Sequence, residues 1–281
     1  MVPVETIRLG HGDSDAWLAP ARGGMVTRFS VAGEDVLYLD EATLADPSKN
    51  VRGGIPILFP IAGKLAPDTL PGATAPLPQH GFARNRPWHV VAEEPDRAVL
   101  ALEADAATRA AYPHDFALRF TYTLGDATLA IEQCFENRGT TPMPIQWGIH
   151  PYFAVPDKAV ARVATDATTA WNNVAGAREA FSGVDFGSGE VDLHLLDHRP
   201  AGTRLSRPGA RDVVLDWSAD HRVLVVWTLP GRPFICVEPW SAPANALQTG
   251  GGIAVPAGQM HVSRVVISSA AFGTSRRSDE A

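Results

Sequence analysis

The chain has 281 residues, of which 45% are hydrophobic and 20% charged, an ordinary composition for a globular protein. Its net charge of −7 and its scattered basic residues argue against nucleic acid or an anionic membrane as the main partner. No apolar run could span a bilayer, and the N-terminus lacks the regions of a secretory signal, so we expect a cytoplasmic protein. The cysteines, Cys134 and Cys236, form no disulfide framework or zinc pattern and are expected to be buried free thiols.

The chain is predicted to consist of short strands separated by turns. Alternating apolar and polar residues, with Gly, Asp and Pro between the runs, are typical of an antiparallel sandwich. No linker divides the chain, so we expect a single domain over residues 1–273 and a disordered tail, 274–281. A loop is predicted at 66–79, a short helix within 104–111 and irregular structure over 156–190, with strands at 6–9, 16–19, 25–31, 36–39, 90–91, 99–102, 116–122, 129–137, 144–149, 171–173, 191–198, 213–217, 222–229, 234–238 and 262–268.

Two apolar strands lead into an ionisable residue that is followed at once by proline. Residues 234–237 precede Glu238, and residues 144–149 precede His150. Proline cannot donate to a sheet ladder and favours an extended residue before it, so both groups are predicted to lie at strand ends, at one rim of the sheet. Taken alone, Glu238 is equally consistent with a glutamate that caps a strand or pairs with an arginine.

Two further stretches place polar side chains on predicted loops. Arg52 precedes two consecutive glycines, which permit positive φ or the close approach of a ligand to the backbone. The spacing of a phosphate-binding loop is absent there. The segment PQHGFARNRPW carries Gln79, His80 and Arg84 among aromatic residues and shows no periodicity. Binding groups concentrate on loops of this kind, so these residues are candidate ligand contacts.

Four short motifs therefore stand in order along the chain: RGGIPILFP from residue 52, QHGFAR from 79, GIHPYF from 148 and VEPW from 237. Together they resemble the aldose 1-epimerase (mutarotase) family, most closely the branch with the hexose-6-phosphate mutarotases and related bacterial epimerases. The resemblance covers most of the chain. It implies an all-β, galactose-mutarotase-like antiparallel β-supersandwich with a groove on one face. It also implies interconversion of the α and β anomers of an aldose without a metal or organic cofactor.

The resemblance also implies roles for individual residues. Glu238 matches the base, His150 the acid, and His80 a residue that holds the ring oxygen and neighbouring hydroxyls. Asp192, with Asp197 as the alternative, matches an aspartate that contacts sugar hydroxyls. These residue types suit the chemistry, because ring opening takes a proton from the C1 hydroxyl and gives one to the ring oxygen. The other predicted substrate contacts are Arg52, Arg84, Gln79 and Trp240, with Phe82, Tyr152 and Phe153 as further aromatic candidates.

Several alternatives remain open at this point. Arg52 and Arg84 would suit a hexose with a phosphate or sulfonate at C6. The chain could also be a carbohydrate-binding protein without turnover, or a glycosidase that uses Glu238 with Asp192. A metal triad of His80, His150 and Glu238 is a fourth possibility. The loop around His80 differs from that of the galactose-specific branch, which leaves the sugar open. The expected partner is a small sugar, and the expected state is a monomer or homodimer.

Overall fold

The computed structural model describes residues 4–187 and 189–270 of the chain. Strands dominate these residues, so the all-β prediction is confirmed. The predicted tail, 274–281, lies outside the described residues. No helix in the described part is long and apolar enough to cross a membrane. The α-helices are α1 (Glu41–Ala45), α2 (Ala106–Ala111) and α3 (Ala246–Thr249).

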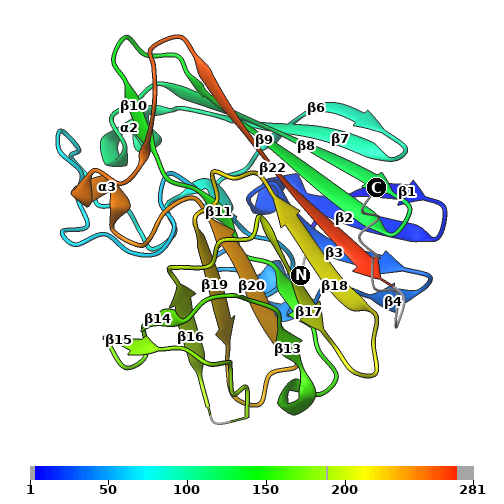
Figure 1. The fold of residues 1–281 in the computed structure, drawn as a ribbon. Helices are drawn as coiled ribbons and strands as arrows, with labels where there is room; N and C mark the ends of the chain where they lie inside the picture. The colour runs from blue at the N-terminus through cyan, green and yellow to red at the C-terminus, as the bar shows by residue number, and fades with distance from the viewer. Residues whose placement is uncertain (1–3, 188, 271–281) are drawn as a thin grey trace, which may run out of the picture.

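The described strands form two large antiparallel sheets and two smaller ones (Figure 1). Sheet I runs in the order β15 (Ala177–Ala180), β14 (Thr169–Asn172), β16 (Val191–Leu195), β19 (Val223–Thr228), β20 (Phe234–Trp240), β11 (Gly148–Ile149) and β5 (Ile57–Leu58), and β12 (Tyr152–Ala154) also pairs with β20. Sheet II runs in the order β13 (Arg162–Val163), β17 (Gly202–Ser206), β18 (Asp212–Trp217), β22 (Met260–Ala270), β9 (Thr128–Asn137), β8 (Phe116–Gly125), β7 (Arg97–Glu103) and β6 (His89–Glu94). The smaller sheets are β1 (Ile7–His11), β2 (Ser14–Ala19), β3 (Met25–Val31) and β4 (Glu34–Asp35), and the pair β10 (Met143–Ile145) and β21 (Ile253–Val255).

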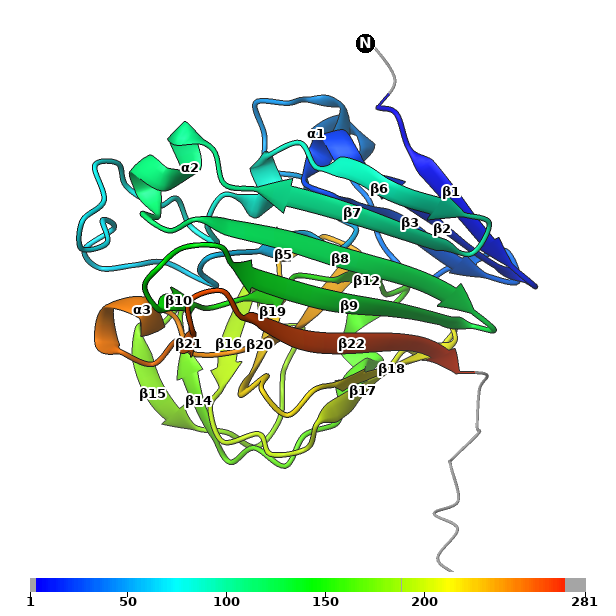
Figure 2. The ribbon, with the colours of Figure 1, turned by 90° about the horizontal axis from the view of Figure 1, so that it is seen from above.

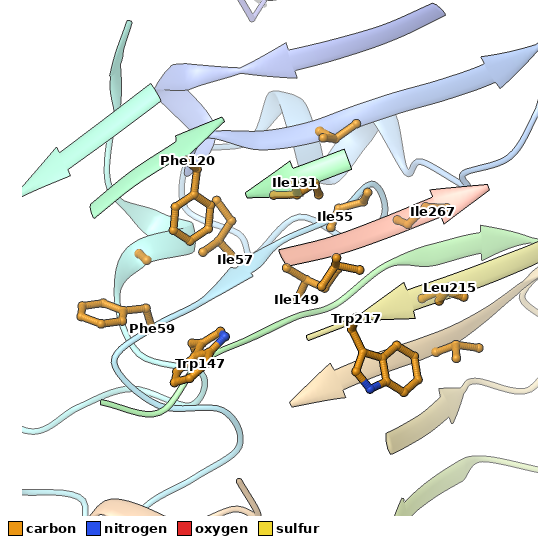
Figure 3. Close-up of a cluster of buried hydrophobic side chains, with 14 of the residues drawn as sticks. Ile55, Ile57, Phe59, Phe120, Ile131, Trp147, Ile149, Leu215, Trp217 and Ile267 are labelled. Atoms are coloured by element: carbon orange, nitrogen blue, oxygen red, sulfur yellow. The ribbon is translucent and has the colours of Figure 1, made fainter. Parts of the chain in front are cut away.

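Sheet II packs over one face of sheet I, and the main hydrophobic core fills the space between them (Figure 2). Strand β9 alternates buried and more exposed residues along its length, which places one face of sheet II in the core. Figure 3 shows Phe120 and Ile131 of sheet II beside Ile57 and Ile149 of sheet I. The opposite face of sheet I is therefore the one left free to hold a site.

Several local predictions are confirmed and others are wrong. Helix α2 forms inside the predicted range because Asp105 caps it, accepting from the backbone N–H of Thr108 at 2.7 Å. The strand predicted at 36–39 is wrong, since β4 ends at Asp35 and only isolated bridges follow. Within the irregular stretch predicted at 156–190, the short strand expected at 171–173 corresponds to β14, whereas its hairpin partner β15 is missed, because β15 is exposed and carries no apolar alternation that would signal pairing. Cys236 is buried as predicted, whereas Cys134 faces outward on β9 and is half-buried.

The prediction that Glu238 lies at a strand end is also wrong. Strand β20 continues through Pro239 to Trp240 and pairs with β19 over this length. On its other side, the pairing with β12 stops at Cys236, and β11 pairs only at Trp240. Pro239 lies in this gap, so no ladder partner on that side needs its missing N–H. His150, by contrast, follows the end of β11 as predicted, and its backbone N–H donates to the Pro56 carbonyl.

Candidate active site

A cavity of about 610 Å³ opens on the face of sheet I that points away from the main core. This volume lies in the usual range for small-molecule sites. Asp197 is not among the lining residues, because its carboxylate accepts from the backbone and hydroxyl of Thr168 instead. Asp192 is therefore the aspartate that reaches the cavity. The eight predicted site residues all line it: Arg52, Gln79, His80, Arg84, His150, Asp192, Glu238 and Trp240.

Strand register explains why residues far apart in the chain meet here. Ile235 and Val237 of β20 belong to the main core, so Glu238, which alternates with them, points to the opposite face. Glu238 lies opposite Val225 of β19, and Val225 lies opposite His194 of β16. Directly paired residues share a face of the sheet, so this row of three points into one cavity.

Glu238 and His150 form a buried pair at the base of the cavity. Their exposed fractions are 1% and 7%, and Glu238 Oε1 lies 3.3 Å from His150 Nδ1. The other carboxylate oxygen, Oε2, accepts from Trp240 Nε1 at 3.0 Å. Burial raises the pKa of Glu238 well above its usual value, which the hydrogen bond from Trp240 partly offsets.

Burial and the nearby charge of Arg84 lower the pKa of His150 to about 3. Both effects favour a neutral His150 imidazole in the free protein. Between the lowered pKa of His150 and the raised pKa of Glu238, the pair carries a single proton. It gives either a carboxylic acid beside a neutral imidazole or a carboxylate beside an imidazolium, and the net charge of the pair is zero in both forms.

His80 is held in a defined tautomer. Its Nδ1 accepts from the backbone N–H of Gly63 at 3.0 Å, so the neutral ring carries its proton on Nε2. Burial lowers the pKa of His80 well below the usual value, with Arg84 contributing, so the ring is neutral at pH 7. The backbone bends sharply here: φ is 66° at His80 and 69° at Gly81, where a Cβ would lie 2.1 Å from the Phe59 carbonyl oxygen. A glycine after His80 is thus a steric requirement.

The structure adds polar residues that the sequence analysis did not single out. Asn173 Nδ2 donates to Asp192 Oδ2 at 2.8 Å, and His194 Nε2 lies 3.3 Å from Asp192 Oδ1. Both carboxylate oxygens are therefore engaged, which fixes the orientation of Asp192. His194 is two residues from Asp192 on the same strand, and this period of two is the signal that could have identified it. Lys64 also lines the cavity.

The aromatic candidates divide between the cavity and the core. Tyr152 lines the cavity and stacks on the His150 ring, with centroids 4.7 Å apart and an interplanar angle of 7°. Phe82 and Phe153 are buried in the main core, so the suggestion that they contact a sugar is wrong. Their rings pack among apolar side chains of the core, and the sequence alone could not distinguish this position from one in the cavity.

The possible metal ligands differ from the predicted triad. In the part of the chain that the structure describes, His150, Cys236 and Glu238 have ligand atoms within 4.8 Å of one another. His80 is not in this group, and its Nδ1 is already engaged by Gly63. The predicted triad of His80, His150 and Glu238 is therefore not assembled.

Comparisons with known proteins agree with this arrangement. A family model described as Aldose 1-epimerase matches residues 5–268. The "Putative glucose-6-phosphate 1-epimerase" of Salmonella typhimurium is 29% identical over 252 residues, covering 88% of this chain and 81% of that protein. The solved structure of the Slr1438 protein from Synechocystis sp. PCC 6803 is 34% identical, with a TM-score of 0.91 over 95% of this chain and 96% of that one. A galactose mutarotase related enzyme from Lactobacillus acidophilus, 19% identical, gives a TM-score of 0.77 over 95% and 98%.

The fold is thus the predicted galactose-mutarotase-like sandwich, and the cavity pairs a carboxyl group with an imidazole, as expected of a carbohydrate isomerase that works by proton transfer. The chain belongs to the aldose 1-epimerase family. It interconverts the α and β anomers of an aldose by opening and reclosing the sugar ring.

Proposed function

We propose that Glu238 and His150 carry out the two proton transfers of this reaction. The observation that carries the proposal is their buried contact, in which Glu238 Oε1 lies 3.3 Å from His150 Nδ1. The Glu238 carboxylate takes the proton of the C1 hydroxyl while His150 gives one to the ring oxygen, and the C1–O5 bond breaks. Because His150 Nδ1 faces Glu238, Nε2 is the nitrogen left for the sugar. Rotation about C1–C2 and the reverse transfers then close the ring on the other face.

Three neutral or anionic groups are suited to hold the sugar during these steps. His80 offers its Nε2–H to a ring or hydroxyl oxygen, because its Nδ1 is already occupied by Gly63. Asp192 offers two fixed acceptor oxygens to sugar hydroxyls, and Gln79 lies beside His80 with its amide 3.3 Å from Nε2. The His80 donor, fixed before the sugar binds, stabilises charge that develops on oxygen during ring opening.

The substrate we propose is a hexose with an anionic group, in particular a phosphate, at C6. Arg52, Lys64 and Arg84 line the cavity, and none of them has a carboxylate partner within 4.0 Å among the described residues. Arg52 and Arg84 line the same cavity as Tyr152, and both lie close enough to it to offset part of the burial-induced rise in its pKa. Unpaired cations that converge in a cavity favour an anion there.

The name of the Salmonella relative supports the same substrate class, since it specifies glucose 6-phosphate. A neutral hexose is the second candidate, because Arg52 already lies over the Trp227 ring at 6.0 Å and could serve only to order the cavity wall. We further propose a cytoplasmic location, and a monomer or homodimer as the working state.

The test is an anomer-exchange screen by NMR with glucose, galactose, glucose 6-phosphate and a 6-sulfonated glucose. Arg52→Lys and Arg84→Lys are expected to raise KM about tenfold for the anionic sugars and little for glucose. Arg119→Lys, on the outer face of β8, is the matched control. Equal effects on charged and neutral sugars would assign the arginines to ordering the cavity and contradict the C6-anion proposal.

A further inference from the structure

Trp240 makes a hydrogen bond within the protein that a residue serving only to bind sugar would not need. It lies two residues after Glu238 on β20, is 2% exposed, and donates its indole N–H to Glu238 Oε2 at 3.0 Å. Among the described residues, the indole N–H of Trp240 is the donor that hydrogen-bonds Glu238 Oε2. His150 Nδ1 lies 3.3 Å from the other oxygen, Oε1. The two oxygens of the carboxyl group therefore have different neighbours, and the hydrogen bond is the one from Trp240.

The indole ring is itself held in place on several sides. A Cβ on Gly148, its partner on β11, would lie 2.7 Å from the ring atom Cδ1, so only glycine permits this approach. The rings of His80 and His194 meet it edgewise, with centroids 5.6 and 5.0 Å away. A ring packed in this way has one orientation, and its N–H has one direction.

We propose that Trp240 is a positioning residue for the Glu238 carboxylate, in place of the sugar contact that the sequence predicts for it. Tryptophan suits this role because its indole nitrogen is a donor only: it has no lone pair that could compete with Glu238 for the sugar's proton. A hydrogen bond to the ionised carboxylate also compensates part of its lost hydration. The inference rests on the proposed role of Glu238 as the base.

The same tryptophan links the base to the sugar-binding side of the cavity. His194, which packs against the indole ring, also lies 3.3 Å from Asp192 Oδ1 through its Nε2. Displacement of the ring would therefore disturb both carboxylates, Glu238 through the lost hydrogen bond and Asp192 through His194. The position of the base and the position of the sugar hydroxyls are thus set by one packed group.

Trp227 provides an internal control of matched chemistry. It also lines the cavity and also donates its indole N–H to a carboxylate, Glu190 Oε1, at 3.1 Å. Glu190 is exposed and is not part of the proposed proton transfer. Loss of this second N–H removes an equivalent bond from the same cavity without touching Glu238.

The experiment replaces Trp240 by Phe and, by amber suppression, by 3-benzothienylalanine, which keeps the ring shape but has sulfur in place of N–H. With the donor lost, we expect kcat to fall about tenfold with KM changed less than twofold, since the carboxylate is no longer held in one orientation towards the C1 hydroxyl. The alkaline limb of the pH profile should move up by about one unit, because the ionised form has lost a donor. The benzothienyl substitution at Trp227 should leave that limb unmoved.

The melting temperature of each variant separates misfolding from lost positioning, and the benzothienyl variant of Trp240 is expected to melt as the native protein does. A raised KM with unchanged kcat would make Trp240 a sugar contact and overturn the proposal, as would an unmoved alkaline limb. Glu238→Gln is measured in parallel. If that variant is active, the role of Glu238 as base has failed; if it is inactive while the Trp240 variants behave as the native protein, only the positioning inference has failed.

Discussion

Glu238→Gln is the substitution that tests the proton-transfer pair most directly, because glutamine can keep the contacts of Glu238 and should leave the fold intact. The amide oxygen can still accept from Trp240 Nε1, and the amide N–H can donate to Nδ1 of neutral His150, where Oε1 now lies 3.3 Å away. A neutral side chain also replaces a carboxyl group whose charged form burial already disfavours. We therefore expect a stability change within about 1 kcal/mol.

The rate should respond very differently. Removing the base is expected to cost about 10²- to 10⁴-fold in kcat, equivalent to about 2.7–5.4 kcal/mol of barrier. His150→Asn should lose a similar factor, and the double variant should be little slower than the slower single variant, because both groups act in one step. Exchange NMR at anomeric equilibrium measures the rate, and binding of a 1,5-anhydro sugar, which has no C1 hydroxyl, measures cavity integrity. Glu132→Gln, exposed on β9, is the control. Near-normal exchange in Glu238→Gln would refute the assignment of the base.

Two further predictions concern conditions rather than residues. The working pair holds one proton, gains a second as pH falls through about 3, the pKa of His150, and loses its proton as pH rises through the raised pKa of Glu238. With a substrate that does not titrate in the range, kcat/KM should stay level from pH 7 to 5, fall on the alkaline side, and fall again below about pH 3; a decline between pH 7 and 5 would contradict a pair that keeps one proton over this range. Activity should also survive extensive dialysis against a chelator, since acid–base residues suffice; loss that an added metal restores would exclude this mechanism.

The sequence predicted the all-β class and several residues that line the cavity better than it predicted their surroundings. Glu238, His150 and His80 were identifiable because each interrupts an apolar or glycine-rich stretch with an ionisable group. The residues that contact them could not be identified in this way. Contacts such as that between His194 and Trp240 depend on the register of strands β16, β19 and β20, which no local pattern encodes.

Protonation states and strand ends were likewise beyond local pattern. The neutral state of His150 follows from burial and from Arg84, two features that only the folded chain brings together. The continuation of β20 through Pro239 depends on where β11 and β12 happen to leave a gap. Proline indicates a strand end only where a neighbouring strand would pair on the side to which its missing N–H would point.

The alternation along β20 limits how the chain can change its length. Glu238 reaches the cavity because it is an even number of residues from Cys236 and an odd number from the core residue Val237. The turn of residues 229–233 joins β19 to β20. A one-residue deletion there that slid β20 by one position would turn Val237 towards the sugar and Glu238 into the core. A two-residue change would preserve the facing of every side chain. Insertions and deletions in this turn therefore keep Glu238 in the cavity only if they change its length by an even number of residues, whatever the turn's composition.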